Sequence, residues 1–303
     1  MRKDRGFITV ATGDEKYYRL AANLCVSYKK RSSGQCPFAL VCDRENDYTA
    51  VFDHVIVTGD VRNSTIDKLL IRLSPYSETL FLDADTLVID DIDDLWDIFA
   101  DGDDVSAFGC TLPLDSRKGW FTYEGSGAYQ DQIKYLISMN GGVYYVRKSA
   151  VSEKVFQDAI RIIDNYADID FKYFSQPQDE PVMAMAMVIN DCKPADIAYD
   201  MIVLPFSKEK ITVDYCGNVY EGKSRTHKKL IHFATARTNL FLYNCLNDVI
   251  RNEGHAKDRS HYYRMRLRYA IHDIEYGIRH GGGKVLRSLG MEKLVDFLKW
   301  NNR

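Results

Sequence analysis

The sequence predicts an α/β protein in which a mixed, mainly parallel sheet is flanked by helices and followed by a helical C-terminal region. Three observations support this fold class. Short apolar runs alternate with segments of helical period through the first half of the chain, which is the pattern of strands joined by helices. The chain has 303 residues and is 46% hydrophobic, which suffices for one large core with an appendage. From residue 239 the pattern is helical to the end.

Each expected element rests on its own local pattern. Apolar runs predict strands at residues 7–11, 38–42, 54–58, 80–82, 105–109, 141–147 and 230–234. Helical periodicity predicts helices at residues 17–30, 64–74, 92–99, 150–166, 180–190, 262–279 and 284–300, the last with a kink near Gly290. Either Ser64 or Thr65 is the expected N-cap of the second helix. Residues 111–140 have weak periodicity, and a long irregular segment in an α/β domain usually serves a site.

Composition makes several classes of protein improbable. The net charge of −3 does not indicate nucleic-acid binding. The seven cysteines are scattered and form no Cys-x-x-Cys pair, which favours a reduced, cytoplasmic environment without a zinc site. The charged N-terminus passes directly into a strand, so no signal peptide is expected. The longest apolar run, residues 182–189, is too short to span a bilayer.

The C-terminal region differs in charge from the rest of the chain. Residues 251–303 carry twelve Lys or Arg and six Asp or Glu, a net charge of +6, whereas the other 250 residues carry −9. Together with Tyr262, Tyr263 and Trp300, these basic helices suit an anionic membrane surface. The alternative is that the helices pack on the preceding domain and leave a solvated charged face.

Two aspartates carry the strongest functional signal. Asp83 and Asp85 follow the apolar run 80–82, so they fall at the carboxyl end of a buried strand, where open α/β sheets bind ligands. Residues i and i+2 of a strand point to the same side, and two carboxylates held that way are costly without a cation. The pair predicts a hard divalent ion that carries diphosphate oxygens. The alternative is a polar strand-to-loop turn.

The most specific match to a known family is in residues 77–97, which read SETLFLDADTLVIDDIDDLWD. This segment resembles the metal-binding segment of glycosyltransferase family 8, the family of glycogenin and the bacterial galactosyltransferases of lipooligosaccharide synthesis. Four other stretches fall in the family's order, so the resemblance covers roughly residues 5–240. It implies a GT-A-type, Rossmann-like mixed sheet, with a catalytic domain at residues 1–240 and a basic C-terminal helical extension at residues 241–303.

The resemblance also implies which residues bind the donor. The turn after the first strand resembles the family's nucleotide-binding opening, and an ordinary strand-to-helix turn is the alternative. Lys68 is placed where relatives carry a basic residue that reaches the donor, although it could be a solvated lysine, with Arg72 serving instead. The two glycines of the family's Asn-x-Gly segment allow close backbone approach or mark a bulge. The implied donor-binding residues are Ala11, Thr12, Asp14, Tyr17, Lys68, Asp83, Ala84, Asp85, Asn140, Gly141, Gly142 and Arg237.

A further segment resembles the family's Asp-Gln pair beside the reacting carbon. Gln178, Asp179 and Glu180 are therefore the candidate catalytic residues, with Glu180 standing where the family has Gln. The competing interpretation makes Asp179 a helix N-cap with Pro181 in the first turn, and both can hold.

His232 resembles the histidine that supplies the family's third metal ligand, which gives the set Asp83, Asp85 and His232. The family continues with Gly and then a lysine that binds diphosphate, and this chain has neither. Arg237 is the nearest residue that could grip phosphate instead.

The resemblance implies a metal-dependent, retaining glycosyltransferase of the hexosyltransferase type. It would move a hexose or N-acetylhexosamine from a UDP-sugar to a hydroxyl of a glycan, lipid-linked or protein acceptor, in surface glycan synthesis at the cytoplasmic side of the membrane. The ion would be Mn²⁺ or Mg²⁺, and an imidazole ligand favours Mn²⁺. Front-face attack needs no protein nucleophile, whereas double displacement would need Asp179 or Glu180.

Two other functions fit part of the pattern. The apolar run with Asp83 and Asp85 is also the signature of haloacid-dehalogenase-type phosphatases, in which the first aspartate is the nucleophile. That motif normally opens the domain, whereas here three strands are expected before it. A non-catalytic sugar-nucleotide-binding protein is the second alternative, because the usual lysine after His232 is missing.

Overall fold

The structure of the protein is a computed structural model that describes residues 4–33, 36–195, 201–204, 207, 209–234, 236–252 and 259–277. The chain forms two compact units. The first comprises Met1–Val203 and His227–His232, and the second comprises Leu204–Thr226 and Phe233–Arg303. The division at residue 240 expected from sequence stays a prediction.

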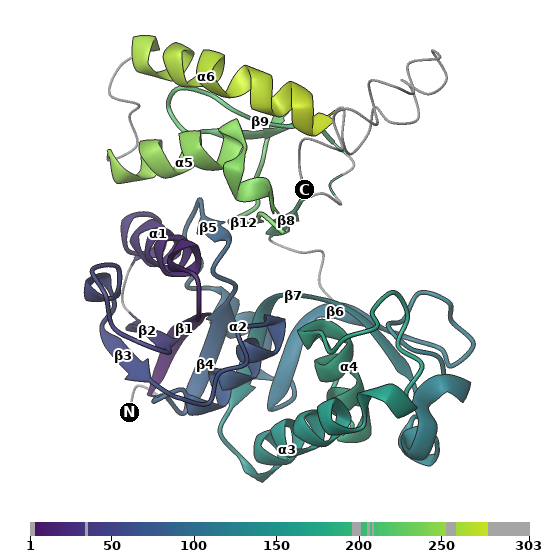
Figure 1. Cartoon of the computed structure of the whole chain (residues 1–303). Coiled ribbons are helices and arrows are strands. Elements are labelled where there is room, and N and C mark those ends of the chain that lie inside the picture. Colours follow the sequence, from purple (N-terminus) through teal and green to yellow (C-terminus); the bar gives the residue numbers. More distant parts are fainter. Residues whose placement is uncertain are drawn as a thin grey trace, which may run out of the picture. The chain divides into compact units, whose positions relative to one another are not determined.

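The first unit is built on a six-stranded sheet with the order β3-β2-β1-β4-β7-β6 (Figure 1). Its strands are β1 (Arg5–Ala11), β2 (Phe38–Cys42), β3 (His54–Val57), β4 (Glu78–Leu82), β6 (Val105–Leu112) and β7 (Leu136–Arg147). The first four strands run parallel, whereas β7 is antiparallel to both β4 and β6. The mixed α/β sheet predicted from sequence is therefore confirmed.

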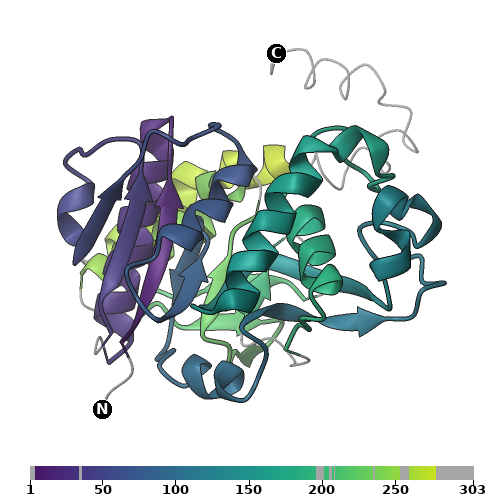
Figure 2. The ribbon, with the colours of Figure 1, turned by 90° about the horizontal axis from the view of Figure 1, so that it is seen from below.

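Helices cover both faces of this sheet, which explains why its strands read as continuous apolar runs. The ring of Phe7 on β1 lies 4.6 Å from that of Tyr28 and 5.2 Å from that of Trp96. The next residue, Ile8, points the other way, into a cluster shared with the remaining helices. One face is covered by α1 (Glu15–Arg31) and α2 (Leu95–Ala100), and the other by η2 (Thr65–Leu73), α3 (Ala150–Asp164) and α4 (Asp179–Ile189). Helices α3 and α4 lie side by side in both views (Figure 1, Figure 2).

A small second sheet in the first unit joins distant parts of the chain. Its order is β5-β12-β8, with β5 (Thr86–Val88), β12 (Leu230–His232) and β8 (Met201–Val203). Strand β12 is antiparallel to β5, and His232 pairs with Thr86. This register brings His232 beside the segment that contains both aspartates.

Two helices predicted from sequence are present, but with shifted ends or a different geometry. The helix expected at residues 64–74 is the 3₁₀ helix η2, and its N-cap Ser64 makes no side-chain capping bond. Asp67 inside it accepts backbone hydrogen bonds from Arg62 and Asn63, which holds its first turn against the preceding loop. The predicted helix at 92–99 is shortened to α2.

The segment expected to be irregular, residues 111–140, is partly regular. Strand β6 extends to Leu112, the 3₁₀ helix η3 covers Glu124–Gln132, and β7 already begins at Leu136. A register irregularity after Ala107 interrupts the alternation that would have revealed the two strands. Two further 3₁₀ turns, η1 (Thr49–Val51) and η4 (Tyr166–Asp168), complete the described elements of the first unit.

The second unit combines a small antiparallel sheet with helices. Its strands are β9 (Ile211–Val213), β10 (Val219–Glu221) and β11 (Ser224–Arg225), and its helices are η5 (Ala236–Asn239), α5 (Phe241–Arg251) and α6 (Arg259–Gly277). The helical C-terminal region is thus confirmed for residues 241–251 and 259–277, and the helix predicted at 284–300 lies outside the described residues. Sequence patterns missed the sheet because strands of two or three residues are too short to show alternation.

The aromatic residues predicted to face a membrane differ in exposure. Tyr262 on α6 is buried, its hydroxyl donates to the carbonyl oxygen of Val213 at 2.9 Å, and its ring packs against Phe241. Tyr262 therefore serves packing inside the second unit, whereas Tyr263 is exposed. Trp300 lies outside the described residues. In the ranges that the structure describes, we find no helix long and apolar enough to cross a membrane.

Candidate metal centre

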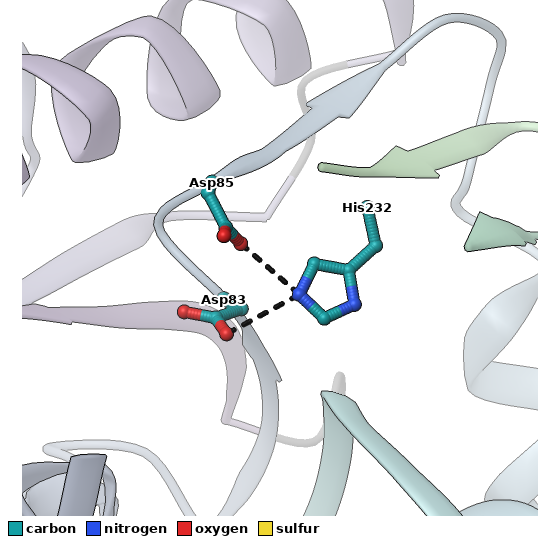
Figure 3. A group of neighbouring side chains, drawn as sticks. All are labelled: Asp83, Asp85 and His232. Carbon is teal, nitrogen blue, oxygen red and sulfur yellow. Dashed lines mark ion pairs between the residues drawn. The ribbon is translucent and has the colours of Figure 1, made fainter. Parts of the chain in front are cut away.

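The two aspartates lie on the tight turn between β4 and β5. The backbone N–H of Asp83 donates to the carbonyl oxygen of Gly142 at 3.0 Å, and the N–H of Thr86 donates to the carbonyl oxygen of Asp83 at 2.9 Å. These bonds fix the turn directly after the buried strand. Because His232 pairs with Thr86, the turn directs both carboxylates toward the imidazole (Figure 3).

The three side chains lie close enough to share one ion. Nε2 of His232 is 3.4 Å from Oδ2 of Asp83 and 3.0 Å from Oδ1 of Asp85. One ligand atom from each residue lies within 4.8 Å of the other two. Oδ1 of Asp85 is buried and accepts no hydrogen bond in suitable geometry, which leaves its lone pairs available to a cation. Two carboxylates and one imidazole fit a divalent ion such as Mn²⁺ or Mg²⁺.

Neighbouring charges shift the pKa values of His232 and Asp83. Burial alone lowers the pKa of His232, but the carboxylates of Asp85 and Asp83 outweigh burial and raise that pKa to about 10. Burial alone raises the pKa of Asp83, but Lys68 and His232 hold that pKa well below its usual range. At neutral pH the metal-free protein therefore holds a protonated imidazole beside the ionised carboxylate of Asp83, in the place that a divalent cation would fill.

Metal binding is expected to release protons. A metal bound to Nε2 must displace the proton that the raised pKa of about 10 keeps there at neutral pH. We expect the apparent Mn²⁺ affinity to rise about tenfold per pH unit between pH 6 and 8, with about one proton released per ion. Calorimetry in buffers of different ionisation enthalpy measures both quantities, and a pH-independent affinity would contradict the assignment of His232.

Lys68 lies at the centre of the charged cluster. Its Nζ is 2.8 Å from Oδ2 of Asp83 and 2.9 Å from Oδ2 of Asp179, and its side chain is only 17% exposed. Burial alone lowers the pKa of Lys68, but Asp179 and Asp83 raise it well above its usual value. The alternative of a solvated lysine is therefore wrong. Arg72 pairs with the exposed Asp60 instead.

The predicted catalytic carboxylates begin α4. Oδ2 of Asp179 also accepts a hydrogen bond from the hydroxyl of Tyr144 at 3.3 Å. Oε1 of Glu180 accepts from the backbone N–H of Gly141 at 2.6 Å. Burial is the largest cause of the raised pKa of each carboxyl group, and each is further modified by its charged neighbours. Both carboxylates thus accept hydrogen bonds from residues of β7.

The start of α4 corrects one prediction. Gln178 is the N-cap and makes no side-chain capping bond, and Asp179 is the first helical residue. The carboxylate of Asp179 is held by Lys68 and Tyr144, so it does not cap the helix. Pro181 in the first turn is confirmed. Oε1 of Gln178 accepts from the hydroxyl of Thr65 at 3.0 Å, which ties the N-cap to η2.

The Gly141-Gly142 pair lies in a bulge of β7. Ala107 on β6 pairs with Tyr144, whereas Gly109 pairs with Met139, so β7 has extra residues between these two positions. A Cβ atom on Gly142 would lie 2.6 Å from Nδ1 of His232. A Cβ on Gly141 would lie 2.5 Å from Oδ2 of Asp179. The bulge left open for the glycines is therefore present. The close approaches in the structure are to His232 and Asp179, and a close approach to a ligand stays a prediction.

Gly142→Ala is expected to weaken metal binding. The added methyl group would collide with the His232 ring, which would have to rotate away from Asp83 and Asp85. We expect a loss of roughly tenfold or more in Mn²⁺ affinity, comparable with the loss of a group that orients a ligand. Isothermal titration measures it, and Gly102→Ala, whose nearest contact is 3.5 Å away, is the matched control. An unchanged affinity would show that His232 does not depend on this close approach.

Residues after β1 are held by neighbours that sequence reasoning missed. Ala11 ends the strand, and the hydroxyl of Thr12 donates to Oδ2 of Asp67 at 2.6 Å. Asp14 is the N-cap of α1, as in the ordinary strand-to-helix alternative, while Tyr17 is 48% exposed and available to a ligand. These features are compatible with both interpretations of the turn.

Three further residues bear on the site that was predicted from sequence. Ala84, between the aspartates, is buried, as is its neighbour Leu82. Arg237 belongs to the second unit, and its role toward the diphosphate stays a prediction. Tyr144 was missed by the sequence analysis, and its hydroxyl donates to Oδ2 of Asp179.

Comparison with known proteins supports the fold. No family model matches the chain, and no curated protein matches it either. Among solved structures, it is similar to the apo structure of WbbM, a bifunctional glycosyltransferase, with a TM-score of 0.50 and 14% sequence identity. The match covers 88% of this chain and 52% of that one, so this chain spans about half of WbbM. The likeness shows a GT-A-like glycosyltransferase fold, and membership of family 8 stays a prediction.

Proposed function

We propose that this protein is a metal-dependent glycosyltransferase that moves a hexose or N-acetylhexosamine from a UDP-sugar to an acceptor hydroxyl. The observation that carries the proposal is the convergence of Asp83, Asp85 and His232 at the carboxyl edge of a GT-A-like sheet. In such sheets this edge binds ligands. A hydrolytic metal site would fit the same ligand types, but the glycosyltransferase-like fold favours sugar transfer.

The chain's residues have distinct parts in the proposed reaction. Asp83, Asp85 and His232 would hold Mn²⁺ or Mg²⁺, which when bound neutralises the charge that builds on the diphosphate leaving group. Lys68 adds a fixed positive charge beside Asp83. The ribose and base would lie beside Ala11, Thr12, Asp14 and Tyr17, and Arg237 would contact the diphosphate.

For the stereochemical course we propose retention by front-face attack. Asp179 already bonds Lys68 and Tyr144, and Glu180 bonds Gly141, so both carboxylates are engaged in positioning. The oxygens that make these bonds, Oδ2 of Asp179 and Oε1 of Glu180, would have to lose them in order to act as the nucleophile. Mass-spectrometric detection of a sugar ester on Asp179 or Glu180 after rapid quenching would contradict this course and support double displacement.

The acceptor and location complete the proposal. We propose a glycan, lipid-linked or protein acceptor in surface glycan synthesis, with the protein in the cytoplasm at the inner face of the membrane. Exposed Tyr263, Arg264 and Arg268 on α6 are compatible with an anionic membrane surface. Failure to sediment with anionic liposomes at low salt would contradict the membrane contact.

A screen of UDP-sugars for Mn²⁺-dependent hydrolysis tests the function without knowledge of the acceptor. Release of UDP from one sugar nucleotide, lost on chelation and restored by Mn²⁺, is expected. UDP-sugar binding without hydrolysis or transfer would favour the non-catalytic alternative. Release of inorganic phosphate from phosphomonoesters, with an acyl-phosphate trapped on Asp83, would favour the phosphatase.

A further inference from the structure

We infer that Asn140 is a positioning residue of the metal centre, which fixes the imidazole of His232 so that Nε2 faces Asp83 and Asp85. The inference rests on the proposed function and deepens it, because it concerns how the same metal site is held. It gives Asn140 a role other than the contact with the donor that the family resemblance implies.

The orientation of the Asn140 amide is set by its neighbours. Its Oδ1 accepts a hydrogen bond from the backbone N–H of Gly142 at 3.0 Å. Its Nδ2 faces Oε1 of Glu180 at 3.4 Å, an acceptor. Turning the amide over would place NH₂ against the N–H of Gly142 and oxygen against the carboxylate, so both bonds would be lost.

This orientation determines which nitrogen of His232 carries a proton. Nδ1 of His232 lies 2.9 Å from Oδ1 of Asn140, which has no proton to give. Nδ1 must therefore be the donor, whether the ring is neutral or charged. In the neutral ring the lone pair is then on Nε2, which points to Asp83 and Asp85 (Figure 3).

Burial makes this hydrogen bond decisive. His232 is only 4% exposed, so water has little access to replace the acceptor for Nδ1. Without Asn140 the ring would leave a buried N–H unpaired, or would take the other tautomer, whose Nε2 is protonated and cannot bind a metal.

Glu180 extends the support from α4 to β12. Oε1 of Glu180 accepts from the N–H of Gly141 at 2.6 Å as well as facing the Asn140 amide. The bulge of β7 is thereby held to the start of α4, and Asn140 is held to His232. This connection from Glu180 through Asn140 to His232 acts on the ligand and not on the reacting atoms.

Substitution of Asn140 tests the inference through metal affinity. For Asn140→Leu we expect a loss of about 10- to 100-fold in Mn²⁺ affinity, the usual effect of removing a group that orients a metal-binding histidine. Asn140→Asp keeps an acceptor for Nδ1 and should lie closer to the wild-type protein than Asn140→Leu. Thr65→Val, which removes the nearby bond to Gln178 outside this network, is the matched control and should not change the affinity.

The readouts separate the inference from its rivals. Mn²⁺ dissociation constants come from electron paramagnetic resonance, and histidine ¹⁵N shifts of the Cd²⁺-loaded protein should show a protonated Nδ1 and a coordinated Nε2. Wild-type Mn²⁺ affinity in Asn140→Leu would overturn the inference. A lower melting temperature or a higher KM for the UDP-sugar in that variant would then point to a structural role or a sugar contact instead. If the wild-type protein itself bound no Mn²⁺, the proposed function would fail instead.

Discussion

Asp83→Asn is expected to reduce Mn²⁺-dependent donor turnover by about 10³-fold, which corresponds to about 4 kcal/mol of transition-state stabilisation. Asp83 is a candidate metal ligand and also the partner of Lys68 at 2.8 Å. Asparagine keeps the shape of the side chain but removes the negative charge that binds the metal ion and Lys68. The affinity for Mn²⁺ should fall with turnover, because only Asp85 and His232 remain as ligands.

A matched control separates this effect from a general loss of acidic charge. Asp90 lies in the same segment but is exposed, so Asp90→Asn should retain wild-type turnover and affinity. Circular dichroism of Asp83→Asn shows whether the fold is kept. Near-normal metal-dependent turnover in a folded Asp83→Asn protein would mean that the site has been assigned to the wrong residues.

The main sheet could be predicted because its strands are buried on both faces. Residues 38–42 read as one apolar run, and the structure has β2 at Phe38–Cys42. The gathering of Asp83, Asp85 and His232 was also expected, although only from family order. Nothing in the local sequence around His232 reveals that β12 pairs with β5.

The support around the metal ligands could not be predicted in the same way. The contacts of Glu180 with Gly141, and of Asn140 with His232, join segments far apart in the chain through a bulge. A bulge changes which side chains face each other, so a period-two pattern cannot give its register. The strands of the second unit were not predicted for a different reason. A strand as short as Ser224–Arg225 cannot show a periodic pattern.

Lys68→Met is expected to destabilise the metal-free protein by about 3 kcal/mol, because it leaves the buried carboxylate of Asp179 without its cation and that of Asp83 with His232 alone. The side chains of Asp179 and Asp83 are only 6% and 19% exposed. Mn²⁺ should restore the part of the loss that comes from Asp83, but not the part from Asp179. Arg72→Met is the control on the same 3₁₀ helix, and since its partner Asp60 is 67% exposed, we expect less than about 0.5 kcal/mol.

The pH dependence gives this prediction a sign. Burial already raises the pKa of Asp179 in spite of Lys68, and without Lys68 that pKa must rise further. A carboxyl group whose pKa is raised by folding binds protons more tightly in the folded state, so it favours folding increasingly as the pH falls. The stability deficit of Lys68→Met should therefore be larger at pH 8 than at pH 5 when measured by urea unfolding without metal. A deficit that grew toward pH 5 would show that Lys68 does not compensate the charge of Asp179.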